Sequence, residues 1–188
     1  MRSIDVVAIN GGHKVDSDLV EVVEQARDYF PVEAWDEIRY LGELTLEQDF
    51  NISTVGDTMG ALLFEKLIKK MRTIIKELGL ENLLLGITPD PIVCINYFLD
   101  KLTFKRTAYL VHDYVDKRLG VVSLFSVDDE ASSKVVAHGL GHSKGLQHHE
   151  KPADLMHPAL LKLPSLQVNG FCKTCIRDLE ERRESQSA

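Results

Sequence analysis

Histidine is concentrated in one short stretch of the sequence. Of the seven histidines among 188 residues, five lie between positions 138 and 157, where an even distribution would place fewer than one. A Cys-x-x-Cys pair, Cys172 and Cys175, follows shortly afterwards. Imidazole and thiolate are the side chains that zinc prefers in proteins. Metal binding is therefore the first chemistry that the sequence indicates.

Three of these histidines have the spacing of a single metal site. His138 and His142 are four residues apart on a predicted helix, so both imidazoles project from one face and can bind one tetrahedral ion. Gly145 can take the positive φ that turns the chain back, and His148 then arrives as a third ligand. Three histidines leave the fourth position of a zinc ion open, as in catalytic sites. The alternative is a histidine-rich surface helix that binds no metal.

The same residues carry a family resemblance. The segment His138-Gly-Leu-Gly-His142-Ser-Lys-Gly145-Leu-Gln-His148 resembles the signature H-E-x-x-H-x-x-G-x-x-H of the metzincin zinc peptidases, which also have a Met-turn beneath the metal. Met156 lies at a suitable distance for that turn. Within the clan the chain resembles an archaemetzincin, over residues 54–180 and most specifically at the C-terminal end. The resemblance implies a metzincin-like fold and zinc-dependent hydrolysis of peptide or protein substrates.

The resemblance also implies a second zinc site, directly after the third histidine. Where the family has two cysteines and then a Cys-x-x-Cys, this chain has His149, Asp154, Cys172 and Cys175. These residue types can bind zinc together, with fewer soft ligands than four cysteines. The cysteine pair opens a predicted helix, where thiolates are favoured. The alternative, a thioredoxin-type redox dithiol, fits less well because the pair follows a proline-containing loop rather than a β-α-β unit.

Gly139 departs from the family pattern at the position of the catalytic glutamate. That carboxylate takes a proton from the attacking water and delivers it to the leaving amine, a contribution of about 10²–10⁴-fold in rate. Glycine can do neither, and in a helix it costs about 1 kcal/mol relative to alanine. The neighbouring Glu150, Asp154 and His157 give no clear substitute. Two functions stay open: a peptidase with an unidentified base, and a relative that binds zinc and peptides without cleaving them.

The remaining pattern predicts the elements that position these residues. Apolar runs predict strands over residues 4–9, 32–41, 83–87, 108–115 and 121–127. Helical periodicity predicts helices over 19–30, 58–78, 132–146 and 171–183, the second capped by Asp57 and stopped at Gly79. Residues 147–170 are predicted to form an irregular loop. Cys94 is expected to be a buried core thiol.

Length and composition set the class of the protein. At 188 residues, 44% hydrophobic and with a net charge of −7, the chain predicts one soluble α/β domain over residues 1–188. We expect a twisted mixed sheet, a zinc helix, a Met-turn and a C-terminal helix, with an N-terminal part over 1–145 and a C-terminal part over 146–188. The acidic balance argues against nucleic-acid partners, and short apolar runs against a membrane span or signal peptide. Three cysteines do not form a disulfide framework, so we expect a cytoplasmic, reducing context. We also expect the protein to be a monomer.

Overall fold

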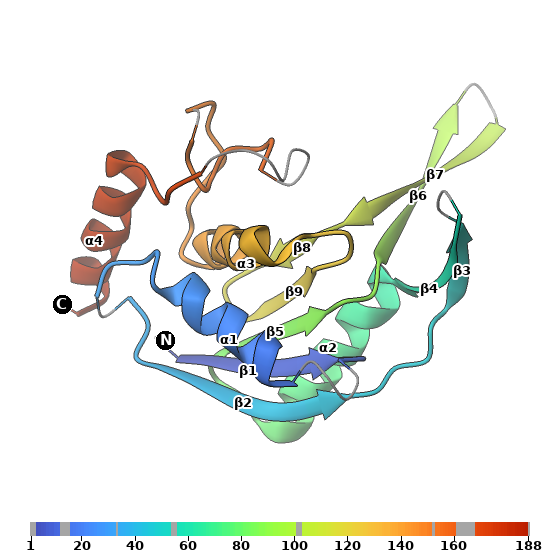
Figure 1. Cartoon of the computed structure of the whole chain (residues 1–188), viewed down its shortest axis with the longest axis horizontal. Helices are drawn as coiled ribbons and strands as arrows, with labels where there is room; N and C mark the ends of the chain where they lie inside the picture. The colour runs from blue at the N-terminus through green and yellow to red at the C-terminus, as the bar shows by residue number, and fades with distance from the viewer. Residues whose placement is uncertain are drawn as a thin grey trace.

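The computed structural model of the chain describes residues 3–11, 16–32, 34–53, 56–100, 103–151, 153–160 and 168–187 (Figure 1). Four helices occur in this part of the chain: α1 (Asp16–Arg27), α2 (Phe64–Leu78), α3 (Asp129–Ser143) and α4 (Lys173–Ser187). The strands are β1 (Ser3–Ile9), β2 (Glu37–Leu44), β3 (Phe50–Ser53), β4 (Thr58–Leu63), β5 (Leu83–Thr88), β6 (Ile92–Asp100), β7 (Thr103–Val111), β8 (Asp113–Val115) and β9 (Leu119–Ser123). The α/β class is confirmed.

The strands form two mixed sheets. The larger has the order β2-β1-β5-β9-β8, in which the first four strands are parallel and β8 pairs antiparallel with β9. The smaller has the order β3-β4-β6-β7. β5 and β9 are fully buried and read as continuous apolar runs, as expected of parallel strands that are covered on both faces. The edge strand β8 is three residues long and lies beside α3.

The larger sheet carries a hydrophobic core on each face. Alternate residues of β1 point to opposite sides: Ile4 and Val6 join a core with α1 and α3, whereas Val7 and Ile9 join a core with α2. Figure 1 shows α1 and α3 lying side by side over the sheet, with α2 on the other side. The first core also includes residues of the C-terminal part, among them Met156 and Leu179. The C-terminal part is therefore packed into the same core.

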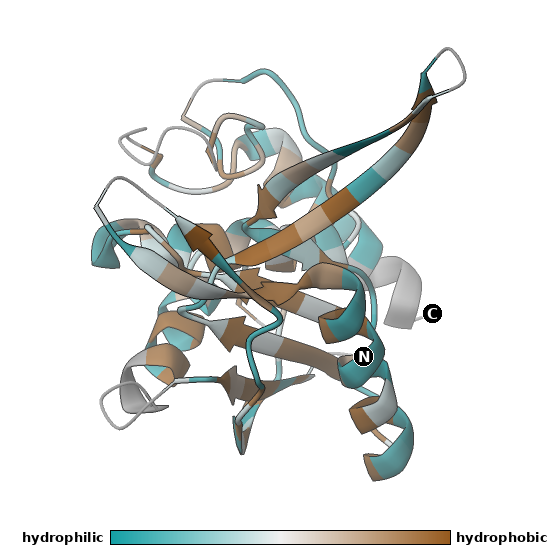
Figure 2. Ribbon diagram, turned by 90° about the vertical axis from the view of Figure 1, so that its right-hand side faces the viewer, coloured by the Kyte–Doolittle hydropathy of each residue, from teal (hydrophilic) through white to brown (hydrophobic). Residues whose placement is uncertain are grey.

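The hairpin β6–β7 projects from the body of the molecule (Figures 1 and 2). Its two strands pair from Ile92 with Val111 to Asp100 with Thr103. Apolar side chains are exposed along it: Tyr97, Phe98, Leu99, Phe104, Tyr109 and Leu110. Cys94 lies at its base and is buried, as predicted. Among the described residues, no helix is both long and apolar enough to cross a membrane.

Several predicted elements were wrong in type or extent. Residues 58–78 form not one helix but the strand β4 followed by α2, and the helix begins after Leu63 rather than at Asp57. β4 pairs with the preceding strand β3 and with the more distant β6, and these pairings override the local helical pattern. The predicted strand over 32–41 lies later, at β2. β3 and the hairpin partner β6 were missed, and residues 124–127 form a turn instead of extending β9. Gly79 ends α2 with φ +61°, as predicted.

Candidate metal centre

The helix α3 places two of the three predicted histidines. Asp128 caps its first turn, where the side-chain oxygen accepts a hydrogen bond from the Ala131 N–H at 2.7 Å. After Ser143 the chain turns back at Gly145, which has φ +86°, as the sequence predicts. The N–H of Leu146 donates to the Gly141 carbonyl at 3.0 Å and closes this turn. The reversal brings the third histidine back toward the helix.

The three imidazoles converge on one point. The Nε2 atoms of His138, His142 and His148 are separated by 3.0–3.1 Å in all three pairs. Nitrogens at these separations can all lie about 2.0–2.1 Å from a common zinc ion. His138 is buried, His142 is half-buried and His148 is exposed, so the group opens to solvent on one side. The donor set and its spacing fit a three-histidine zinc site with an accessible position.

Backbone carbonyls fix the orientation of two of the rings. His138 Nδ1 lies 2.5 Å from the Leu155 carbonyl oxygen, and His142 Nδ1 lies 3.1 Å from that of Leu146. A carbonyl oxygen can only accept, so each Nδ1 carries the proton and each Nε2 presents a lone pair in the neutral ring. Burial lowers the pKa of His138 to about 4, and burial together with its two neighbours lowers the pKa of His148. The shifts favour the neutral forms of His138 and His148, and the carbonyl contacts direct the Nε2 lone pairs of His138 and His142 toward the common point, the form in which imidazole binds a metal.

Met156, the residue proposed for the Met-turn, lies in a turn that packs against α3. The turn is closed by a hydrogen bond from the His157 N–H to the Asp154 carbonyl at 3.0 Å. Met156 is fully buried, and its sulfur would lie 2.7 Å from a Cβ on Gly141. Glycine at this position therefore lets the turn approach α3 closely. Leu155 of the same turn supplies the carbonyl that orients His138.

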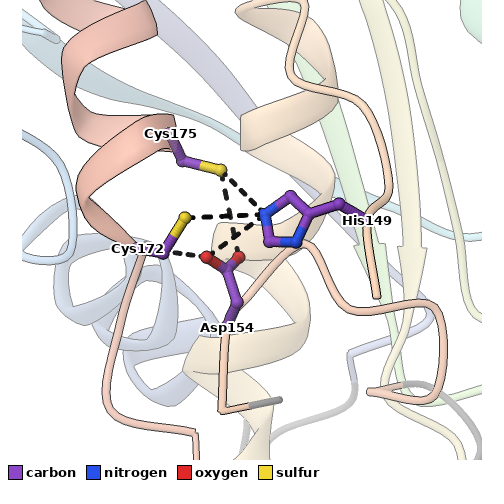
Figure 3. A group of neighbouring side chains, drawn as sticks. All are labelled: His149, Asp154, Cys172 and Cys175. Carbon is purple, nitrogen blue, oxygen red and sulfur yellow. Dashed lines mark hydrogen bonds and ion pairs between the residues drawn. The ribbon is translucent and has the colours of Figure 1, made fainter. Parts of the chain in front are cut away.

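The four residues predicted for a second site also come together (Figure 3). One ligand atom from each of His149, Asp154, Cys172 and Cys175 lies within 4.8 Å of all the others. His149 Nε2 is 3.2 Å from the Cys175 sulfur, 3.3 Å from Asp154 Oδ2 and 3.7 Å from the Cys172 sulfur. This donor set suits a closed, four-coordinate zinc site.

Backbone contacts hold this second cluster in place. Asp154 is buried, and its two carboxylate oxygens accept hydrogen bonds from the N–H groups of Met156 and Cys172, each at 2.6 Å. Burial raises the pKa of the Cys175 thiol to about 12, with Asp154 adding to the shift. In the chain alone, burial thus raises the thiol pKa by more than the helix N-terminus would lower it. A bound cation would reverse this shift, because coordination deprotonates a thiol.

Gly139 has a packing role that the sequence did not indicate. A Cβ at this position would lie 2.8 Å from Val115 Cγ2, closer than van der Waals contact permits. Val115 belongs to the edge strand β8, which therefore packs directly against α3. Since Val115 and Asp113 are two residues apart on the strand, both side chains point to this helix face.

Asp113 is a functional candidate that the sequence analysis missed. Its Oδ2 would lie 3.5 Å from a Cβ on Gly139. Burial raises the pKa of its carboxyl group, and the nearby His142, His148 and His112 oppose that shift. The carboxylate thus lies within electrostatic range of two of the converging histidines. From the alternation of side chains along a strand, one could have predicted that Asp113 and Val115 share a face. The sequence does not show which helix residue that face contacts.

Solved structures share this fold. The chain is similar to an archaemetzincin from Methanopyrus kandleri, with a TM-score of 0.63 and 21% identity over 97% of this chain and 96% of that one. It is similar to an archaemetzincin from Archaeoglobus fulgidus (TM-score 0.57, 18% identity) and to a zinc-dependent peptidase from Methanocorpusculum labreanum (TM-score 0.56, 19% identity), each over 94% of this chain and 99% of the other. No protein-family model and no curated protein matches the sequence. The expected archaemetzincin-like fold is confirmed.

Proposed function

We propose that the protein is a zinc metallopeptidase of archaemetzincin type. The observation that carries this proposal is the triangle of Nε2 atoms of His138, His142 and His148, 3.0–3.1 Å apart. The carbonyl contacts of His138 and His142 direct the Nε2 lone pairs of these two rings toward one another, an arrangement that a cation between them would stabilise. Similarity to structures described as archaemetzincins and as a zinc-dependent peptidase supports the same assignment.

The residues around the triangle have defined tasks in such an enzyme. A bound zinc supplies Lewis-acid polarisation of the scissile carbonyl. The carbonyls of Leu155 and Leu146 keep two of the imidazoles oriented toward the ion, as outer partners of ligands do in zinc enzymes. The edge strand β8 lies next to α3 and can pair with an extended peptide by strand addition. A peptide bound there would pass close to the three histidines.

The second cluster is proposed to hold a structural zinc. Its four side chains can occupy all positions of a tetrahedral ion and leave none for a substrate. The cluster joins two segments that are separated in sequence, because His149 and Asp154 lie in one of them and the two cysteines lie at the start of α4. A zinc ion here would tie α4 to the Met-turn.

A second function is favoured by Gly139. Without a carboxylate at position 139 of the helix, the protein would bind zinc and peptides but not cleave them. The two functions share a metal site and differ in the chemical step. Both are tested on the same preparations.

The test compares the unmodified protein with His142→Ala. Zinc per chain is measured by elemental analysis after reconstitution, and hydrolysis is followed on a mixture of unstructured peptides by mass spectrometry. We expect two zinc ions in the unmodified protein and one in the variant, with cleavage that is abolished by 1,10-phenanthroline and absent from the variant. Zinc binding without cleavage would establish the non-cleaving alternative. Equal zinc contents in the two proteins would refute the three-histidine site.

A further inference from the structure

The carboxylate that Gly139 lacks has a counterpart on the neighbouring strand. In the family pattern the glutamate oxygen lies about 3–3.7 Å from its own Cβ, the span of three covalent bonds. Asp113 Oδ2 lies 3.5 Å from the place where a Cβ on residue 139 would be. The Asp113 carboxylate oxygen therefore lies as far from the Cβ position of residue 139 as the carboxylate oxygen of a glutamate at that position would lie.

The packing of β8 explains how both features occur together. Val115 fills the space next to Gly139, and Asp113 lies two residues earlier on the same face of the strand. A larger residue at position 139 would push this strand away from α3. Glycine on the helix and a carboxylate on the strand thus belong to one arrangement, in which the strand side chain occupies the space left by the helix.

The surroundings of Asp113 suit a group that handles a proton. The side chain is half-buried, and among the described residues it forms no ion pair with His142 or His148, although both lie within electrostatic range. It is therefore near the histidine triangle without being part of it, since it is absent from the group of three ligands. A general base needs this position, close enough to reach a water molecule between itself and the scissile carbonyl.

We propose that Asp113 is the general base of this peptidase, in place of the glutamate that the helix lacks. The proposal rests on the peptidase function proposed above. The Asp113 carboxylate accepts a proton from a water molecule as the water oxygen bonds to the scissile carbonyl carbon. The resulting carboxyl group then donates that proton to the amide nitrogen as the C–N bond breaks. One water is consumed, and a carboxylic acid and an amine are released.

The test uses Asp113→Asn in the full-length, zinc-loaded protein, with Asp129→Asn as the matched control. Asp129 is an exposed carboxylate at the start of α3, so the control removes the same charge from the same helix region. Three quantities are compared: zinc per chain, kcat/KM for a cleaved peptide, and the Kd of acetohydroxamate, which binds zinc and donates a proton to a carboxylate beside it. The last quantity does not depend on turnover.

We expect Asp113→Asn to keep its zinc, to lose about 10²- to 10⁴-fold in kcat/KM, and to bind acetohydroxamate at least about tenfold more weakly. Asp129→Asn should match the unmodified protein in all three. Unchanged kcat/KM and Kd in Asp113→Asn would overturn the proposal, as would loss of zinc, which would make Asp113 a ligand. If the unmodified protein cleaves no peptide, the peptidase function fails, and the hydroxamate Kd alone decides whether Asp113 faces the open position.

Discussion

Replacing Gly139 with alanine should destabilise the protein, although alanine is the better helix former. The residue lies within α3, where it contacts Val115 of β8 so closely that a Cβ would be 2.8 Å from Val115 Cγ2. Valine is stiff about χ1, and on its other side Val115 packs against Gly120, where a Cβ would lie 2.9 Å from its Cγ1. Val115 therefore has little freedom to move aside.

The expected magnitude follows from two opposing terms. Helix propensity favours alanine over glycine by about 1 kcal/mol. Forcing an extra carbon into a packed contact costs about 1–3 kcal/mol. The net effect of Gly139→Ala should be a loss of about 1 kcal/mol, which corresponds to about 2–4 °C in Tm for a chain of this size. In a Val115→Ala background the contact is relieved, and the same change should stabilise by about 1 kcal/mol.

A double-mutant cycle in urea measures both values. Unfolding is followed by circular dichroism and by the fluorescence of Trp35, the one tryptophan of the chain, which is buried. The metal-free and zinc-loaded forms are measured separately, because bound zinc adds its own stabilisation. The sign of the Gly139→Ala effect should reverse between the two backgrounds, with a coupling of about 2 kcal/mol. A stabilisation of similar size in both backgrounds would refute the close contact of β8 with α3.

Two further predictions concern the metal ligands. Cys172→Ser should lose one zinc ion per chain and melt at a lower temperature, while the zinc ion at His138, His142 and His148 is retained. An unchanged zinc content by elemental analysis would refute the second site. The metal-free protein should lose stability as the pH falls from about 6.5 to about 4, because the pKa of His138 is lowered to about 4 by burial and the unfolded chain binds a proton there that the folded chain does not. The loss in the free energy of unfolding, measured by urea titration, should total about 3 kcal/mol. It should be smaller in His138→Gln. A urea midpoint that stays constant across this pH range would contradict the prediction.

The parts of the site that depend on local spacing could be predicted from the sequence. The four-residue offset of His138 and His142 needs only a helix, and the position of His148 needs only a turn at Gly145. The second cluster was placed by the family resemblance. Its closure could not be derived from spacing, because it depends on Asp154 accepting the N–H of Cys172, which is 18 residues away in the sequence. Such a contact is set by how the C-terminal part packs into the core.

The errors arose where pairing with other strands decides the local structure. Residues 58–63 are apolar enough to continue the helix that follows them, and they become β4 because β3 and β6 lie on either side. Asp113 was missed for a related reason. Asp113 and Gly139 are 26 positions apart in the sequence. They meet only because β9 pairs antiparallel with β8 and α3 then packs against this hairpin.

The two clusters are parts of one structure rather than independent sites. His148 and His149 are consecutive, and one points to each cluster. The turn from Asp154 to Met156 does the same: its aspartate belongs to the second cluster, and its Leu155 carbonyl orients His138 in the first. A displacement at the cysteine cluster would move this carbonyl and hence the imidazole that it holds. We therefore expect the second cluster to help position the His138 imidazole, through backbone that both clusters share.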